Sequence, residues 1–158
     1  MWKEVCYILN DLGLNNEQLI YIENSNDFIW KVSEEHAIRV IEFFRDKEMT
    51  DEEICKLLID NPWTISENIR RFEILDIMFD ELDFSTEERK KLIAFNSETY
   101  SSNPQELRQI IDYLKTITNS KDEIKNTLIN NSDYVSNRFE NVKKLILEKS
   151  NWCLDSEV

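Results

Sequence analysis

Apolar residues along this chain recur at intervals of three and four positions, which is the spacing of one face of an α-helix. Residues 34–46 are a clear example, because Ala37, Val40 and Phe44 follow this spacing. No stretch keeps the regular alternation of apolar and polar residues that is typical of a half-buried strand. The pattern therefore predicts an all-α protein.

The helical pattern is part of an internal repeat of 35 residues. Each repeat begins with a short polar residue that is followed three positions later by Gln or Glu, the sequence of a capping box at a helix N-terminus. These first residues are Asn15, Thr50, Ser85 and Ser120. An asparagine stands eleven positions after each of them, at 26, 61, 96 and 131. The apolar positions align in the same register, so the repeat predicts one structural unit used several times.

Each unit is expected to contain two helices joined by a bend. The first helices are predicted at 16–24, 51–60, 86–95 and 121–130. The second helices are predicted at 34–46, 67–82, 104–117 and 137–149, and residues 2–11 fit the second helix of a leading half-unit. The bend is expected to bury one apolar side chain per unit, which is Trp30, Ile65, Tyr100 or Val135.

These units predict a right-handed helical-repeat solenoid of about four 35-residue helix–turn–helix units in a single domain over 1–158. One such unit has too little apolar surface to fold alone, so stacking of neighbours has to supply the core. The predicted boundaries are 1–14 for the half-unit, 15–49, 50–84, 85–119 and 120–150 for the units, and 151–158 for a tail.

The second unit carries a family resemblance. It contains TDEE from Thr50, Leu57-Leu58, and NPWTIS from Asn61 to Ser66, followed by Leu75 and Phe79; Leu12-Gly13-Leu14 closes the half-unit. This pattern resembles the repeat of the mitochondrial transcription termination factor (mTERF) family. The resemblance implies a curved superhelix of helix pairs that binds nucleic acid through a basic concave face. The family's proline occurs here only as Pro62 and its turn glycine only as Gly13.

The charge distribution favours another kind of partner. The chain has 19 Lys and Arg against 32 Asp and Glu, a formal net charge of −13. Residues 15–49 carry −4 and residues 50–84 carry −7, and such acidity repels phosphate. We therefore predict a non-catalytic binding protein whose acidic N-terminal half engages a basic partner protein, and which could act by imitating nucleic acid as an inhibitor or regulator. The candidate acidic residues are Glu34, Glu35, Glu42, Asp46, Asp76, Glu81 and Asp83.

The alternative hypothesis is an mTERF-like protein that binds DNA or RNA in transcription or RNA metabolism. Its candidate residues are Arg70, Arg71, Arg89, Lys90, Lys91, Arg108, Lys143 and Lys144. Both charged sets are also compatible with a solvated surface, or with ion pairs between equivalent positions of successive units. The second possibility predicts that Glu73 pairs with Arg108 and Asp80 with Lys115.

Composition narrows the chemistry further. The single glycine, Gly13, excludes glycine-rich phosphate-binding loops, and one histidine with three widely spaced cysteines gives no metal or triad motif. We therefore predict no catalytic, cofactor-binding or metal-binding residue. No apolar run approaches the roughly 20 residues of a membrane span, and we expect a cytoplasmic protein with reduced thiols. Trp63 and Trp152 lie outside the apolar positions of the repeat and are candidate partner contacts.

Overall fold

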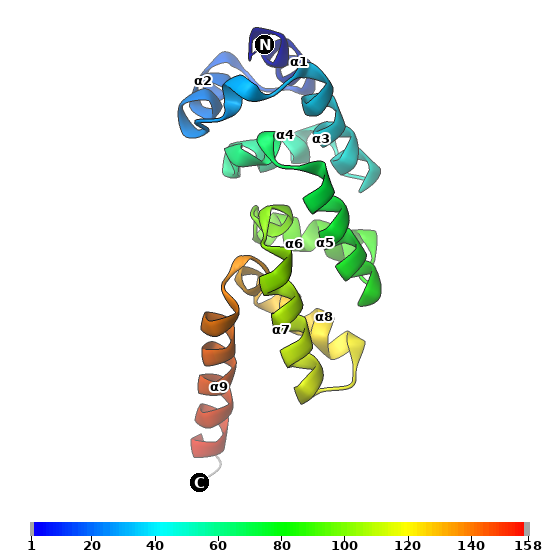
Figure 1. Cartoon of the computed structure of the whole chain (residues 1–158), viewed down its shortest axis with the longest axis vertical. Coiled ribbons are helices and arrows are strands. Elements are labelled where there is room, and N and C mark those ends of the chain that lie inside the picture. The colour runs from blue at the N-terminus through cyan, green and yellow to red at the C-terminus, as the bar shows by residue number, and fades with distance from the viewer. Residues whose placement is uncertain (1, 157–158) are drawn as a thin grey trace.

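The computed structural model describes residues 2–156, with side chains described over 2–149, so Trp152, Cys153 and the predicted tail lie outside the described side chains. Every regular element in this part of the chain is helical (Figure 1). The α-helices are α1 (Trp2–Leu12), α2 (Asn16–Ser25), α3 (Glu34–Asp46), α4 (Asp51–Asp60), α5 (Ile69–Glu81), α6 (Thr86–Phe95), α7 (Pro104–Ile117), α8 (Lys121–Asn130) and α9 (Phe139–Ser156). Four short 3₁₀ helices are η1 (Ile29–Lys31), η2 (Pro62–Ser66), η3 (Thr99–Ser101) and η4 (Ser132–Ser136). The all-α prediction is confirmed.

The helices are arranged as successive pairs along the long axis of the molecule, from the N-terminus at one end to α9 at the other (Figure 1). In each pair the first helix leads through a 3₁₀ turn into the second. First helices pack on first helices, as α2 does on α4 and α6 on α8, and second helices pack on second helices, as α5 does on α7 and α7 on α9. Helix α1 packs on α3 in the manner of a second helix, as the sequence pattern predicts. None of the helices in the described residues is long and apolar enough to cross a membrane.

Side-chain caps determine where the first helices begin. Full capping boxes are present at Asn15, Thr50 and Ser85, whose side chains accept from the backbone N–H three residues later while Gln18, Glu53 and Glu88 accept from the cap N–H. A fourth full box at Ser120 is wrongly predicted. The Thr118 hydroxyl accepts from the Ser120 N–H at 3.1 Å and donates to the Glu123 carboxylate, so that carboxylate does not reach back to the cap.

Most of the aligned apolar positions of the second helices form the core, as predicted, but Leu145 of α9 is exposed. Ala37, Phe72, Leu107 and Val142 are all buried. The expectation for the first bend is wrong, because Ile29 is buried there and Trp30 is 58% exposed. In the third unit the bend buries Tyr100, which packs against aromatic rings from the two preceding units, among them Phe44 and Phe72.

The asparagine that follows each first helix bonds to the next unit. The side-chain amide of Asn26 donates to the Pro62 carbonyl and to the Ser66 hydroxyl, both at 3.0 Å. Thirty-five residues later, Asn61 donates to the Ser97 carbonyl and the Ser101 hydroxyl, and the pattern recurs once more. Its members are Asn26, Asn61 and Asn96, which we term the asparagine ladder. The aligned Asn131 instead donates to Thr127 of its own helix. The sequence shows this aligned set, but its role becomes visible only in the structure.

Candidate functional site

Helix α3 carries a row of acidic side chains on its exposed side. Glu34, Glu42 and Asp46 are exposed, and none of them forms an ion pair with any residue that the structure describes. With the half-exposed Ile38 they are spaced four residues apart, which places them along one side of the helix. We call Glu34, Glu42 and Asp46 the α3 acidic stripe. Glu35, from the same predicted set, pairs with Arg39 at 2.8 Å.

A shallow groove of about 200 Å³ runs beside this stripe, between α1 and α3. Its walls include Ile8, Ile38 and Ile41. Its polar lining consists of Asp11, Glu42 and Arg45, and Arg45 pairs with Asp51 at 3.1 Å. The groove therefore combines apolar side chains with carboxylates, which suits a partner that presents both apolar and cationic groups.

Two other predicted acidic residues are bound within the molecule. Glu81, the last residue of α5, accepts two hydrogen bonds from the Arg108 guanidinium, at 2.7 and 3.3 Å, and these bonds lower the pKa of Glu81 below its usual value. Asp83 pairs with Lys121 at 3.4 Å. Glu81 therefore connects its unit to the next, and Asp83, in the turn before α6, connects to the start of α8.

These contacts overturn the predicted pairs between equivalent positions. Arg108 pairs with Glu81 instead of Glu73, because the start of α7 lies beside the end of α5 and the two helices are not in register. Asp80 pairs with Arg89 instead of Lys115. Equivalent positions of neighbouring second helices are thus shifted along the helix axis relative to one another.

Asp76 and Arg89, which the sequence analysis assigned to two opposite kinds of surface, lie together in the interior. The Asp76 carboxylate accepts from Arg89 at 2.7 Å and from the Tyr100 hydroxyl at 2.6 Å, and it also pairs with Lys47. Arg89, whose side chain is 8% exposed, also pairs with Asp80 and donates to the Phe84 carbonyl at 2.9 Å. The Arg89 guanidinium cannot reach a phosphate backbone from this position. The Asp76 carboxylate already has three partners inside the molecule, so it is not available to a basic partner protein.

The electrostatics of this cluster follow from its burial. Burial raises the pKa of Tyr100 well above its usual range, and the neighbouring Asp76 carboxylate raises it further. Burial alone would lower the pKa of Arg89, but hydrogen bonds with Asp80 and Asp76 outweigh it and raise that pKa. The sequence does contain a sign of this cluster, because Asp76 and Arg89 are charged residues at positions that are apolar in the other units. Residue 76 aligns with isoleucines there, and residue 89 aligns with leucine or isoleucine.

The remaining predicted basic residues are dispersed. Arg71 pairs with Glu67 at 3.1 Å, Lys90 pairs with Glu53 at 3.5 Å, and Lys143 lies over the rings of Tyr113 and Phe139. Three remain exposed without an ion pair among the described residues, one each on α5, α6 and α9: Arg70, Lys91 and Lys144. They form no row comparable to the α3 acidic stripe.

Trp63 is partly exposed, as expected of a candidate contact, and its ring packs on that of Phe28 with centroids 5.5 Å apart.

Over the described residues, no group of three or more His, Cys, Asp or Glu side chains could hold a metal ion. Comparison of the sequence with models of known protein families gives no match, and comparison with curated proteins gives none either.

Proposed function

We propose that this chain is a right-handed helical-repeat solenoid, related in architecture to mTERF repeats, that binds a basic partner protein through its acidic N-terminal half. The solenoid is supported by the asparagine ladder, since three pairs of neighbouring units use the same hydrogen bonds at the same spacing. The α3 acidic stripe carries the functional proposal, because its carboxylates remain uncompensated in a molecule that pairs most of the other candidates.

The surroundings of the stripe favour a protein partner. Ile38 interrupts the carboxylates and also lines the α1–α3 groove. An apolar contact flanked by charges is typical of protein interfaces, in which burial of apolar surface contributes affinity and charge contributes specificity and association rate. Nucleic-acid-binding proteins are one class of basic partner. In binding such a protein, the carboxylates of the stripe would take the place of the phosphate groups of a nucleic acid.

The test compares the triple variant Glu34→Gln/Glu42→Gln/Asp46→Asn with a control that removes the same charge elsewhere, Glu87→Gln/Glu98→Gln/Glu140→Gln. These control residues are exposed and lie in the second half of the chain. Binding of a fluorescein-labelled lysine-rich peptide is measured by fluorescence anisotropy. We expect the stripe variant to lose about tenfold in affinity, at a few tenths to 1 kcal/mol per exposed charge, and the control to change less than about twofold.

Equal losses in the two variants would contradict the proposal, because net charge alone would then explain binding. Labelled single- and double-stranded DNA and RNA are tested in the same assay at low salt. Tight oligonucleotide binding that weakens steeply with added salt would overturn the proposal in favour of mTERF-like nucleic-acid binding.

A further inference from the structure

The first helices of neighbouring units are joined by a lysine in two places. Lys90 of α6 reaches Glu53 of α4 at 3.5 Å, and 35 residues later Lys125 of α8 reaches Glu88 of α6 at 3.2 Å. The side chains of Lys90 and Lys125 are only 21% and 12% exposed. In both grooves, therefore, the aliphatic part of a lysine is packed between the helices, and its ammonium ends at the capping glutamate.

The groove between α2 and α4 lacks this lysine. The residue aligned with Lys90 and Lys125 is Cys55, and the residue aligned with Glu53 and Glu88 is Gln18. The short Cys55 side chain is buried, with its thiol 3.6 Å from the Leu12 carbonyl. A pocket of about 610 Å³ remains here, whereas the groove that holds Lys90 leaves only about 110 Å³.

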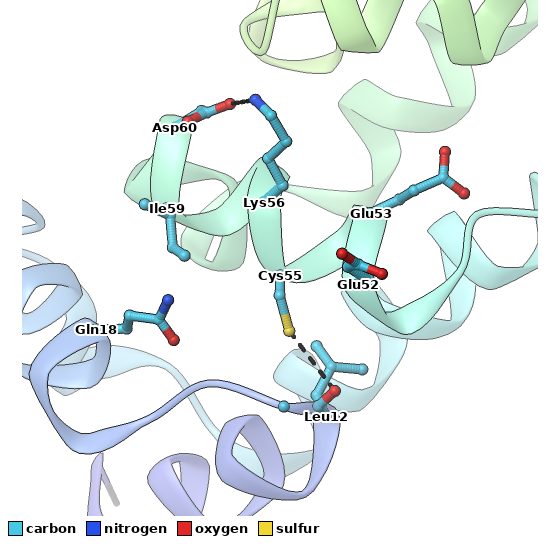
Figure 2. A pocket seen from close by; sticks show the side chains of 9 residues that line it. Leu12, Gln18, Glu52, Glu53, Cys55, Lys56, Ile59 and Asp60 are labelled. Carbon is cyan, nitrogen blue, oxygen red and sulfur yellow. Dashed lines mark hydrogen bonds and ion pairs between the residues drawn. The ribbon is translucent and has the colours of Figure 1, made fainter.

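The lining of this pocket suits an ammonium group on an aliphatic stem. Leu12, Cys55 and Ile59 provide apolar contacts, with the Gln18 amide beside them (Figure 2). Glu52, Glu53 and Asp60 also line the pocket, and its one cation, Lys56, is turned toward Asp60 and pairs with it. Glu53 already pairs with Lys90, and Asp60 with Lys56, so the Glu52 carboxylate and the Gln18 amide oxygen are the groups that can take up the charge of a lysine. Its methylene groups can lie on the apolar floor.

We propose that this pocket receives a lysine side chain from the basic partner and so completes the row that Lys90 and Lys125 form in the other two grooves. The inference rests on the proposed function, because the partner supplies the lysine. Leu12 lines both this pocket and the α1–α3 groove beside the acidic stripe. One partner surface can therefore contact the stripe and the pocket together.

The direct test is a titration of the ¹⁵N-labelled full chain with Nα-acetyl-lysine methylamide, followed through backbone amide shifts. The matched probe is Nα-acetyl-norleucine methylamide, which has the stem without the ammonium. We expect saturable shifts at Leu12, Gly13, Gln18 and residues 52–60 with the lysine probe, and at least about fivefold weaker binding of the norleucine probe. Equal binding of the two probes, or lysine-probe shifts spread over all acidic segments, would overturn the proposal.

Three variants sharpen this test. Cys55→Lys places an internal lysine where Lys90 and Lys125 stand, and it should abolish binding of the lysine probe. Cys55→Ser keeps the pocket open and should bind as the unmodified chain does, and so should Phe95→Lys, which adds the same charge at an exposed position on α6. Lysine-probe binding that persists in folded Cys55→Lys would overturn the proposal.

A fourth variant keeps the proposal testable if Cys55→Lys does not fold. Gln18→Glu retains the capping box and restores the carboxylate found at Glu53 and Glu88, so it should tighten lysine-probe binding about twofold to fivefold. An unchanged or weaker affinity would overturn the proposal.

The lysine-rich peptide separates this inference from the proposed function. If the acidic-stripe variant loses peptide binding while Cys55→Lys retains it, the pocket inference is wrong and the proposed function stands. If neither the stripe variant nor its control changes peptide binding and Cys55→Lys abolishes it, the pocket is the binding site and the stripe is not.

Discussion

The α2–α4 and α4–α6 contacts join equivalent helices but have different interiors. Between α2 and α4, Ile54 and Cys55 occupy the places taken by Arg89 and Lys90 one unit later. The earlier contact leaves a pocket, whereas the later one is crossed by the Lys90–Glu53 ion pair, and the neighbouring Arg89 pairs with Asp76 and Asp80 of α5. The capping boxes and the asparagine ladder are the same at both. The same caps and ladder bonds therefore occur at a contact that leaves a pocket and at one that holds a buried lysine stem and its ion pair.

The buried cluster should give the largest effect. Arg89→Ile leaves the Asp76 carboxylate buried without its guanidinium partner, and we expect a loss of about 3–5 kcal/mol in the free energy of unfolding. Asp76→Ile/Arg89→Ile restores the residue type of the equivalent positions Ile41 and Ile54, and it should recover most of that loss. Urea unfolding of the single and double variants measures this coupling. A double variant as unstable as Arg89→Ile alone would show that the loss does not come from leaving the Asp76 carboxylate uncompensated.

The asparagine ladder should give the next largest effect. Asn61→Ala removes two donated hydrogen bonds and leaves the Ser97 carbonyl without that donor, so we expect a loss of about 1–3 kcal/mol. Asn131→Ala is the comparison variant. Its amide makes neither ladder bond but donates to Thr127 of its own helix and accepts from the exposed Lys149 side chain, and its loss should cost less than about 1 kcal/mol. If Asn61→Ala and Asn131→Ala lost equal stability in thermal or urea unfolding, the asparagine would contribute only by capping the C-terminus of its own helix, and not by linking two units.

The half-buried ion pair between Lys90 and Glu53, across the α4–α6 groove, should have a smaller, pH-dependent effect. Hydrogen bonding from the Thr50 backbone, assisted by Lys90, lowers the pKa of Glu53 below its ordinary 4.5 despite some desolvation. A lowered carboxyl pKa adds stability that is fully present above the ordinary value and is lost as pH falls through the lowered one. Glu53→Gln keeps a capping box of the kind at Gln18. It should therefore be about 0.5 kcal/mol less stable than the unmodified chain at pH 7, and this difference should disappear as pH falls below the lowered pKa of Glu53. A difference that persists in acid would exclude the charge as its cause.

The turns before the first helices should show the smallest effect. Glu48 and Asp83 have positive φ angles of 62° and 59°, at positions aligned with Gly13. Glu48→Gly relieves this left-handed strain but adds chain entropy to the unfolded state, so we expect a net gain of about 0.5 kcal/mol. Asp83→Gly should gain less, because it also loses the ion pair with Lys121. A lower melting temperature for Glu48→Gly would contradict this explanation.

Local chemistry made the helices predictable. The first helices run within a residue of the predicted ranges, because cap residues such as Thr50 and Ser85 bond to backbone groups only three positions away. The pairing of charges was less predictable. Glu81 with Arg108, and Asp80 with Arg89, depend on how far neighbouring helices are shifted along their axes. The pocket beside Cys55 could have been suspected from the aligned Lys90 and Lys125, but its size depends on how closely α2 and α4 approach.

By itself, the sequence determined that the described part of this protein is all-helical, where its first helices begin, and most of the apolar positions of the second helices that face the core. Each of these properties depends on contacts within a few residues or on the periodicity of one helix. Only the tertiary structure decided that Asp76 and Arg89 neutralise each other in the interior, that Trp30 is exposed, and that the α3 acidic stripe has no ion-pair partner among the side chains described over 2–149. Those outcomes depend on the distance between side chains from different units, and that distance is set by the packing of helices against one another.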